Sequence, residues 1–364
     1  MRILFCHAGR AWTGSTRVFA SAARGLARRG HQVTFVCPPD SPVEQRLDYE
    51  AYEVLPMPLD GTWSMAAWRL RGVLDLRFVE VCFAHTEREQ LIAAAASRMA
   101  ERAAVVRRIA PGDPGTLARA GKMARRLAAT GAMVALDEDV ECEAVRGTPI
   151  GTVVVSPGVS VEDYDAVLPA PRSAVGIRGC ERLIACSYDP TSRVRAAVVL
   201  RTLAMLQPRH PELGVAFVGP GSDSEELRMH AAALGVTSRV SFLGERGDYL
   251  SVLRSADLGW VVARSDDAIY AYLDLLALRR PVLATHDVMS QRYVANNIGG
   301  MLLEPDDPPG TAAAVARLLA HDDEREAMGE AGRGRVAREF TEGTMLDGFE
   351  EAVRRAADRT LWVR

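Results

Sequence analysis

Short apolar segments alternate with segments of helical periodicity along the whole chain. Runs such as Gln32–Cys37 have the length and β-branched character of buried strands, and the segments between them repeat apolar residues at helical spacing. Short apolar strands separated by helices indicate a parallel sheet with crossover connections. In the first half this pattern predicts strands at Arg2–Cys6, Gln32–Cys37, Ala51–Leu55, Val79–Ala84, Ala103–Arg108, Met133–Leu136 and Thr152–Val155, and helices that include Thr16–Arg29, Arg88–Arg98 and Gly115–Ala129.

The alternation breaks at Leu168–Gly179, a stretch rich in Pro, Gly and Ser, and then resumes. The second series predicts strands at Leu183–Ser187, Val215–Val218, Val240–Phe242, Leu258–Val262, Val282–Thr285 and Gly300–Leu303. We therefore expect α/β architecture with two Rossmann-like, doubly wound parallel-sheet domains facing a central cleft. The expected boundaries are 1–168 for the first domain, 169–180 for a linker, 181–340 for the second domain, and 341–364 for a C-terminal helix that crosses back to the first domain.

Composition narrows the class of protein. The chain has 364 residues, 48% of them apolar, and a net charge of −3, which gives no electrostatic case for nucleic-acid binding. No apolar run approaches the roughly 20 residues that span a bilayer, and the opening residues read as a strand rather than a signal peptide. Six cysteines have neither metal-ligand nor redox spacing, which is typical of buried thiols in a cytoplasmic protein.

Three features of the first half are candidates for ligand contact. Gly14 and Ser15 open a helix after the first strand, where they are either ligand-facing or a plain helix start. His85 ends a strand and points toward the cleft side, with a structural role as the alternative. Arg107 and Arg108 end another buried strand, where a guanidinium needs a partner. That partner is either a ligand (a phosphate or an acidic acceptor) or the acidic run Asp137–Glu143.

The second half carries the stronger signal. In SDDAIYAYLDLLALRRPV, Asp266 precedes a helix and Asp274 lies within it. The residues around Asp274 are apolar, and a carboxylate in such surroundings requires a polar partner or a ligand. The amides of residues 268–270 open that helix, and free amides at a helix N-terminus bind anions. A carboxylate for sugar hydroxyls, amides for phosphate and a second carboxylate together indicate a sugar-nucleotide site.

Turns after neighbouring strands of the second half add to this site. Arg193 starts a helix after the strand that ends at Ser187, and a cation there can hold a diphosphate; a solvated helix-end charge is the alternative. Gly219 and Gly221 follow the next strand and allow close approach of the backbone to a ligand, or form a plain turn.

In order along the chain, these motifs resemble those of the GT-B glycosyltransferases, in particular the retaining family 4, also called group 1. The resemblance rests on the Gly14 loop with RRGHQV, on AFVGPG at 216–221, on RVSFLG at 239–244, and on the two acids followed by Pro-Val. The chain departs from the family pattern at several positions. Both family glutamates are aspartates, the Gly-Arg pair is Ser187-Tyr188, and the family lysine is Arg193.

The resemblance implies a nucleotide-diphosphate sugar donor (UDP-, GDP- or dTDP-linked), retention of configuration, and no metal or other cofactor. It implies an acceptor that is a glycan, a lipid-linked molecule or a small molecule, as in glycan biosynthesis. The implied catalytic residues are Asp266, Arg193, Arg107 and Arg108; the implied donor-binding residues are Asp274, Ala268, Ile269, Tyr270, Ser187, Gly219, Gly221 and Gly244; and the acceptor side would hold Gly14, Ser15 and His85.

Other functions remain open at this point. The departures also fit a catalytically degenerate glycosyltransferase-like protein that binds a nucleotide or a partner without turnover. An epimerase or phosphorylase of the same fold is a third reading, whereas the missing G-x-G-x-x-G disfavours a dehydrogenase. Clustered Arg and Lys near 116–133 and at Arg24, Arg28 and Arg29 form a candidate peripheral contact with a membrane, or simply a solvated face.

Overall fold

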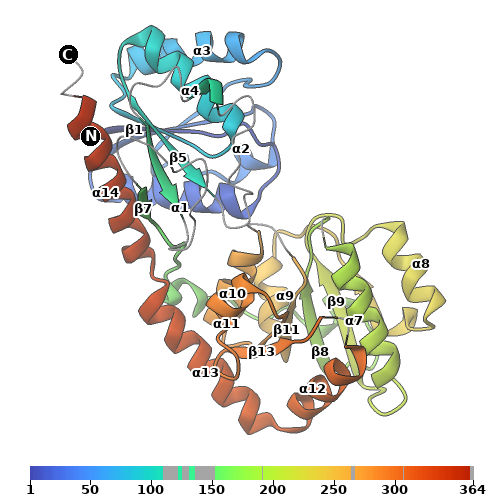
Figure 1. Cartoon of the computed structure of the whole chain (residues 1–364). Coiled ribbons are helices and arrows are strands. Elements are labelled where there is room, and N and C mark those ends of the chain that lie inside the picture. Colours follow the sequence, from blue (N-terminus) through green and yellow to red (C-terminus); the bar gives the residue numbers. More distant parts are fainter. Residues whose placement is uncertain are drawn as a thin grey trace. The chain divides into compact units, whose positions relative to one another are not determined.

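The computed structural model describes residues 1–109, 122–124, 131–135, 152–190, 192–263, 267–305 and 307–360. The chain divides into two compact units, coloured along the sequence in Figure 1. Unit 1 comprises Met1–Pro157 and Glu342–Arg364, and unit 2 comprises Gly158–Thr341. The predicted helix Gly115–Ala129, the acidic run Asp137–Glu143, Cys142 and Asp266 lie wholly or mostly outside the described residues.

Unit 1 is built on a seven-stranded parallel sheet in the order β3-β2-β1-β4-β5-β6-β7. Its strands are β1 (Arg2–Cys6), β2 (Gln32–Cys37), β3 (Glu53–Pro56), β4 (Val81–Ala84), β5 (Ala104–Ile109), β6 (Gly131–Ala135) and β7 (Thr152–Val154). Its helices are α1 (Gly14–Arg28), α2 (Pro42–Arg46), α3 (Trp63–Leu76), α4 (Glu87–Ala100) and α14 (Glu342–Thr360).

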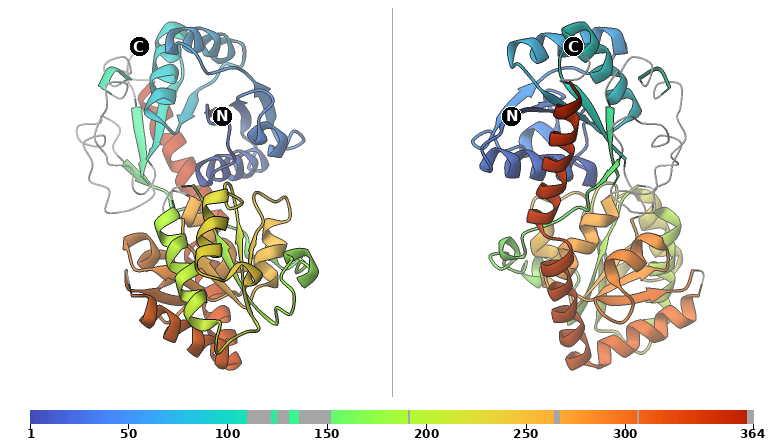
Figure 2. Two further views of the ribbon diagram at one scale, coloured as in Figure 1. Left: turned by 90° about the vertical axis from the view of Figure 1, so that its right-hand side faces the viewer. Right: turned by 60° about the vertical axis from the view of Figure 1, so that its left-hand side comes forward.

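Alternation of side chains along β1 assigns helices to the two faces of this sheet. Leu4 and Cys6 join a core with α3 and α4, which lie side by side (Figure 2). Phe5 points to the other face, where the strand register places it beside Phe35 and Phe83. Phe349 of α14 contacts both Phe5 and Phe83, so the C-terminal helix completes the core of unit 1.

Unit 2 is built on a six-stranded parallel sheet in the order β10-β9-β8-β11-β12-β13. Its strands are β8 (Arg182–Ser187), β9 (Leu213–Val218), β10 (Val240–Phe242), β11 (Leu258–Val261), β12 (Val282–Thr285) and β13 (Gly300–Leu303). Its helical segments are η1 (Val161–Tyr164), α6 (Arg172–Val175), α7 (Arg193–Leu206), α8 (Glu225–Ala233), η2 (Thr237–Arg239), α9 (Tyr249–Ser255), α10 (Asp267–Ala277), α11 (Val288–Val294), α12 (Pro308–Ala320) and α13 (Asp322–Glu339).

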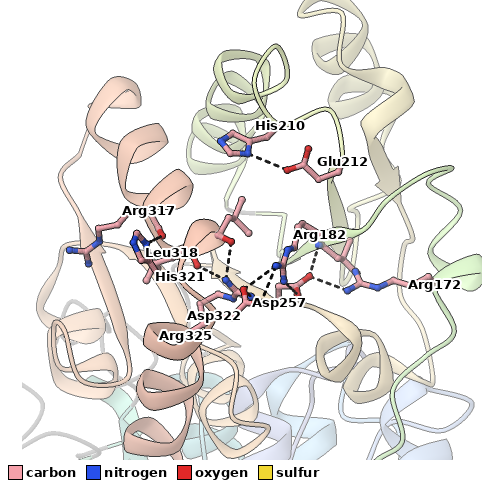
Figure 3. Close-up of polar contacts among 12 residues, drawn as sticks. Arg172, Arg182, His210, Glu212, Asp257, Arg317, Leu318, His321, Asp322 and Arg325 are labelled. Atoms are coloured by element: carbon pink, nitrogen blue, oxygen red, sulfur yellow. Dashed lines mark hydrogen bonds and ion pairs between the residues drawn. The ribbon is translucent and has the colours of Figure 1, made fainter.

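The predicted α/β fold with two doubly wound parallel sheets is confirmed. The connection between the units lies after Pro157, so residues 169–180, expected as a linker, belong to unit 2. Their apolar side chains Val175 and Ile177 are buried there. The segment is also held by charge, because Arg172 forms an ion pair with Asp257 at the start of β11 (Figure 3).

Asp257 is the centre of an ion-pair network at the amino edge of the unit 2 sheet (Figure 3). Its carboxylate accepts hydrogen bonds from Arg172 (3.0 Å), Arg182 (3.3 Å) and the Leu183 amide (2.8 Å). Arg182 also donates to Asp322, which pairs with Arg325, and Arg325 donates to the carbonyls of Leu318 and Leu319. The network therefore ties β8 and β11 to α6 and to the turn between α12 and α13.

Replacing Asp257 tests this network. Asp257→Ala is expected to lower the free energy of unfolding of unit 2 by about 2–4 kcal/mol, because it removes a shared acceptor from two guanidinium groups and one amide. Urea denaturation followed by tryptophan fluorescence measures the loss, since Trp260 is buried in this unit. The control is Asp248→Ala, which removes the exposed pair with Arg246 and is expected to cost less than about 1 kcal/mol. Equal losses in the two variants would contradict the role of Asp257.

Candidate functional site

In each unit, the polar residues of interest gather at the carboxyl ends of the strands, where the strand order reverses. In unit 1 the reversal lies between β1 and β4, and in unit 2 it lies between β8 and β11. At such a point the crossover helices leave in opposite directions, so the strand ends stay open to a ligand.

Glu89 holds the unit 1 edge together. This carboxylate is buried on α4 and accepts hydrogen bonds from the amides of Ala8 (2.5 Å), His85 (2.9 Å) and Thr86 (2.9 Å). Ala8 follows β1, and His85 follows β4, so one side chain joins the two strands at the reversal. The Thr86-x-x-Glu89 spacing is a capping box at the start of α4, which is the sequence signal that locates this residue.

Two residues expected on the acceptor side of unit 1, Ser15 and His85, lie together with the two arginines expected to be catalytic, Arg107 and Arg108. His85 Nε2 is 2.8 Å from Ser15 Oγ, and His85 Nδ1 is 3.3 Å from an Nη atom of Arg108. A guanidinium can only donate, so Nδ1 of His85 accepts, and the proton on Nε2 is donated to Ser15. Arg107 adds to the group, with its Nε donating to the His85 carbonyl (3.3 Å) and an Nη atom 3.7 Å from Glu87.

Gly14 directly precedes Ser15 of this group. It is the first residue of α1, whose N-cap is Thr13 in a capping box with Thr16. The structure thus brings Gly14, Ser15, His85, Arg107 and Arg108 to one edge of one sheet.

His7 and Thr16 are further members of the group that the sequence pattern alone does not single out. His7 is buried directly after β1, with Nε2 3.0 Å from Thr16 Oγ1 and Nδ1 3.7 Å from Glu89. Burial lowers the pKa of His7 because it disfavours the imidazolium, and Arg108 acts in the same direction, whereas Glu89 opposes both. His7 therefore remains neutral at the pH where an exposed histidine begins to gain a proton.

In unit 2, several of the expected donor-binding residues line the corresponding edge. Ser187 ends β8, and its hydroxyl is 3.0 Å from the Tyr249 hydroxyl. Gly219 follows β9 with a φ of 127°, and a Cβ there would collide with the Tyr188 carbonyl. Gly219 donates its amide to the Gly244 carbonyl (2.9 Å), and Gly221 and Gly244 also have positive φ. Glycine at 219 therefore lets the turns after β8, β9 and β10 lie against one another.

Asp274 lies within α10, as the sequence predicts, but its side chain is completely buried. It is 0% exposed and accepts a hydrogen bond from the Tyr164 hydroxyl of η1 (2.6 Å). Residues Ala268, Ile269 and Tyr270 form the first turn of α10, where their amides were expected to bind phosphate, and their side chains are buried. Asp266, which precedes α10, is outside the described residues.

The two arginines at the start of α7 have different surroundings. The Arg193 side chain is 65% exposed and pairs with Glu226 of α8 (2.9 Å). The Arg195 side chain is 15% exposed and donates to Asp287 (2.6 Å) and to the Ala263 carbonyl (3.5 Å). The sequence argument identified Arg193 alone, because only that position matches a lysine of the family pattern.

Within the described ranges, no group of three or more His, Cys, Asp or Glu side chains is arranged to hold a metal ion. In the same part of the chain, no helix has the length and apolar character needed to cross a bilayer.

Two family models match the chain, one in each half. Residues 13–136 match a glycosyl transferase 4-like domain, and residues 184–321 match glycosyl transferases group 1. The first range contains Gly14, Ser15, His85, Arg107 and Arg108 of the unit 1 edge, and the second contains the strand ends and α10 of the unit 2 edge. The chain belongs to the group 1 glycosyltransferases of GT-B fold.

Individual relatives and solved structures agree with this assignment. The D-inositol 3-phosphate glycosyltransferase of Corynebacterium jeikeium is 29% identical over 213 residues, which are 54% of this chain and 51% of that protein. The chain thus spans about half the length of the curated relatives it matches. Anabaena HepE in complex with UDP and glucose is similar in structure, with a TM-score of 0.80, 17% identity, and coverage of 97% of this chain and 99% of that one. A glycosyltransferase from Rickettsia africae has a TM-score of 0.77, 16% identity and 98% coverage of both chains.

The buried state of His7 predicts a pH dependence of stability. The unfolded chain binds a proton at His7 as the pH falls through about 6.5, whereas the folded chain resists it, so unit 1 loses stability below that pH. Each pKa unit of depression corresponds to about 1.4 kcal/mol. His7→Gln is therefore expected to reduce the fall in Tm between pH 7 and pH 5.

His286→Gln serves as the control for this measurement, because the His286 side chain is exposed. It is expected to leave the pH dependence of Tm as in the unsubstituted protein. A His7→Gln variant with the same dependence as the control would show that His7 does not determine the acid sensitivity of unit 1.

Proposed function

We propose that this chain is a glycosyltransferase that transfers a sugar from a nucleoside-diphosphate sugar to a hydroxyl of an acceptor. One observation carries the proposal: the first turn of α10 lies at the carboxyl edge of the unit 2 sheet, beside the reversal between β8 and β11. This turn falls within the residues that match the group 1 glycosyltransferases. The similarity of the whole chain to Anabaena HepE, solved in complex with UDP and glucose, supports a nucleotide-sugar donor.

The donor would bind to unit 2. The amides of residues 268–270 would hold the diphosphate, since the unpaired N–H groups and dipole at a helix N-terminus attract anions. Asp274 would accept hydrogen bonds from the ribose hydroxyls, and Asp266 would accept them from the sugar. The turns at Ser187, Gly219, Gly221 and Gly244 would line the nucleotide. A cation at the start of α7 would neutralise the departing diphosphate, which makes the transfer independent of a metal ion.

The acceptor would bind to unit 1, at the group formed by Ser15, His85, Arg107 and Arg108. In the proposed transfer, the bond between the anomeric carbon and the diphosphate oxygen breaks. The acceptor oxygen forms the new bond on the same face of the sugar, and its proton passes to the departing phosphate. The proton on Nε2 of His85 is already donated to Ser15, so His85 serves as a hydrogen-bond donor rather than as the base.

A second candidate function is a binding protein that has lost turnover. Two observations favour the binding protein. Asp274 is fully buried and accepts a hydrogen bond from Tyr164, and Arg193 forms an ion pair with Glu226 at the surface. The two candidates differ in product formation and not in fold.

Release of nucleotide separates the two candidates. Purified protein is incubated with UDP-, GDP- and dTDP-sugars together with a panel of acceptors that includes inositol phosphates and lipid-linked sugars. Acceptor-dependent release of a nucleoside diphosphate is expected for one donor class. Binding of a nucleoside diphosphate without release from any donor would favour the binding protein, and absence of binding would contradict the glycosyltransferase.

Asp274 gives a sharper test of the donor site. Asp274→Ala is expected to weaken nucleoside-diphosphate binding about tenfold or more, because hydrogen bonds to a charged acceptor are lost. The matched control is Tyr164→Phe, which removes the hydrogen bond that Asp274 accepts but keeps the carboxylate. Calorimetric titration and the Tm are measured for both variants. If Asp274 serves only to pack η1 against α10, both variants will lose stability and neither will lose affinity selectively.

A further inference from the structure

Two arginines at the start of α7 face different surroundings, and of the two it is Arg195 that contacts residues following β11 and β12. The Arg193 guanidinium lies at the surface beside Glu226 of α8. The Arg195 guanidinium lies over the carboxyl ends of the strands, since Ala263 follows β11 and Asp287 follows β12. Arg195 therefore reaches from α7, which follows β8, across to the two strands beyond the β8–β11 reversal.

We propose that Arg195, and not Arg193, is the cation that holds the diphosphate of the donor. This assignment rests on the proposed function, because it names a residue of that donor site. Helix α10, whose first amides are expected to bind the same diphosphate, begins four residues after Ala263, and Arg195 donates to the Ala263 carbonyl. A guanidinium at this place and the helix N-terminus are thus two positive groups at one end of β11.

Asp287 fixes the position of this guanidinium. Asp287 is the N-cap of α11, where its carboxylate also accepts from the Ser290 amide (2.8 Å). Burial disfavours the charged form of Asp287, but the hydrogen bonds from Ser290 and Arg195 outweigh burial and lower the pKa of its carboxyl group. The carboxylate therefore stays ionised and keeps Arg195 in one orientation before any ligand binds.

A guanidinium fixed in this way still has donors for a phosphate. It carries five N–H groups, and among the described residues it donates to Asp287 and to the Ala263 carbonyl only. The planar arrangement of the remaining N–H groups suits two phosphate oxygens at once, which a lysine does not match. The chain has tyrosine at 188, where the family pattern has an arginine, so Arg195 would supply the charge that this position lacks.

The test compares binding of a nucleoside diphosphate with binding of the corresponding monophosphate. The intact chain is titrated by calorimetry with UDP, GDP and dTDP, and then with the monophosphate of the base that binds. Arg195→Gln is expected to weaken diphosphate binding about tenfold or more, because charge-assisted hydrogen bonds are lost, while monophosphate binding changes less. Arg195→Lys is expected to lie between Arg195→Gln and the unsubstituted chain.

Three further variants separate binding from structural support. Arg201→Gln replaces an exposed arginine of the same helix and is the matched control. Asp287→Asn removes the charge of the ion-pair partner but keeps Arg195, so it is expected to lower the Tm and to reduce the preference for the diphosphate less than Arg195→Gln does. Arg193→Gln tests the competing assignment and is expected to keep that preference.

Two results would overturn the assignment while leaving the proposed function in place. One is an Arg195→Gln variant that keeps the full preference for the diphosphate, and the other is loss of that preference in Arg193→Gln instead. Failure of the unsubstituted chain to bind any of the three nucleoside diphosphates would contradict the proposed function, and the role of Arg195 with it.

Discussion

Both units depend on one constraint of parallel sheets: where the strand order reverses, two adjacent strands end without helical cover. Backbone and side-chain polar groups at those ends need partners, because burying them unpaired costs free energy. Unit 1 meets this need with Glu89, whose carboxylate binds amides that follow β1 and β4. In unit 2, Arg195 of α7, the helix that follows β8, donates to the Ala263 carbonyl that follows β11. Each edge is thus held by a charged side chain from a helix, and each remains polar.

Strand positions could be predicted from the sequence because central strands such as β4, β9 and β11 are buried on both faces and therefore consist of short apolar runs. Five predicted runs coincide with the observed strands β1, β2, β10, β12 and β13, and the others differ from the observed strands by a few residues. The role of residues 169–180 was harder to predict. A segment rich in Pro, Gly and Ser lacks regular periodicity both in a linker and in a loop that packs against a domain. It is the ion pair between Arg172 and Asp257, far apart in sequence, that joins this segment to unit 2.

Site residues could be predicted from the sequence where their role depends on local backbone conformation or on their position at the end of a strand. Gly219 has a positive φ in the turn after β9, as its position after a strand suggested. Ser15 lies at the start of α1 and His85 directly after β4, and their side chains are in contact. Side-chain direction on a helix was not predictable in the same way. Arg193 and Arg195 are two residues apart on α7, so they point to different sides, and which side faces the edge depends on how α7 packs. The partners of His7 likewise depend on the register of β1 against β4.

Ion pairs at the two edges of the unit 2 sheet illustrate how structural and ligand-binding charges differ. At the amino edge, the Asp257 carboxylate receives two guanidinium groups and an amide, and Arg182 and Arg325 share Asp322, so the charges satisfy one another (Figure 3). At the carboxyl edge, Asp287 fixes Arg195 through one donor and its own helix cap, which orients the guanidinium without using all its N–H groups. A carboxylate that positions a cation and leaves donors for an anion is the arrangement that preorganised diphosphate binding requires. The same two residue types, Asp and Arg, therefore brace the fold at one edge and are suited to hold a ligand at the other.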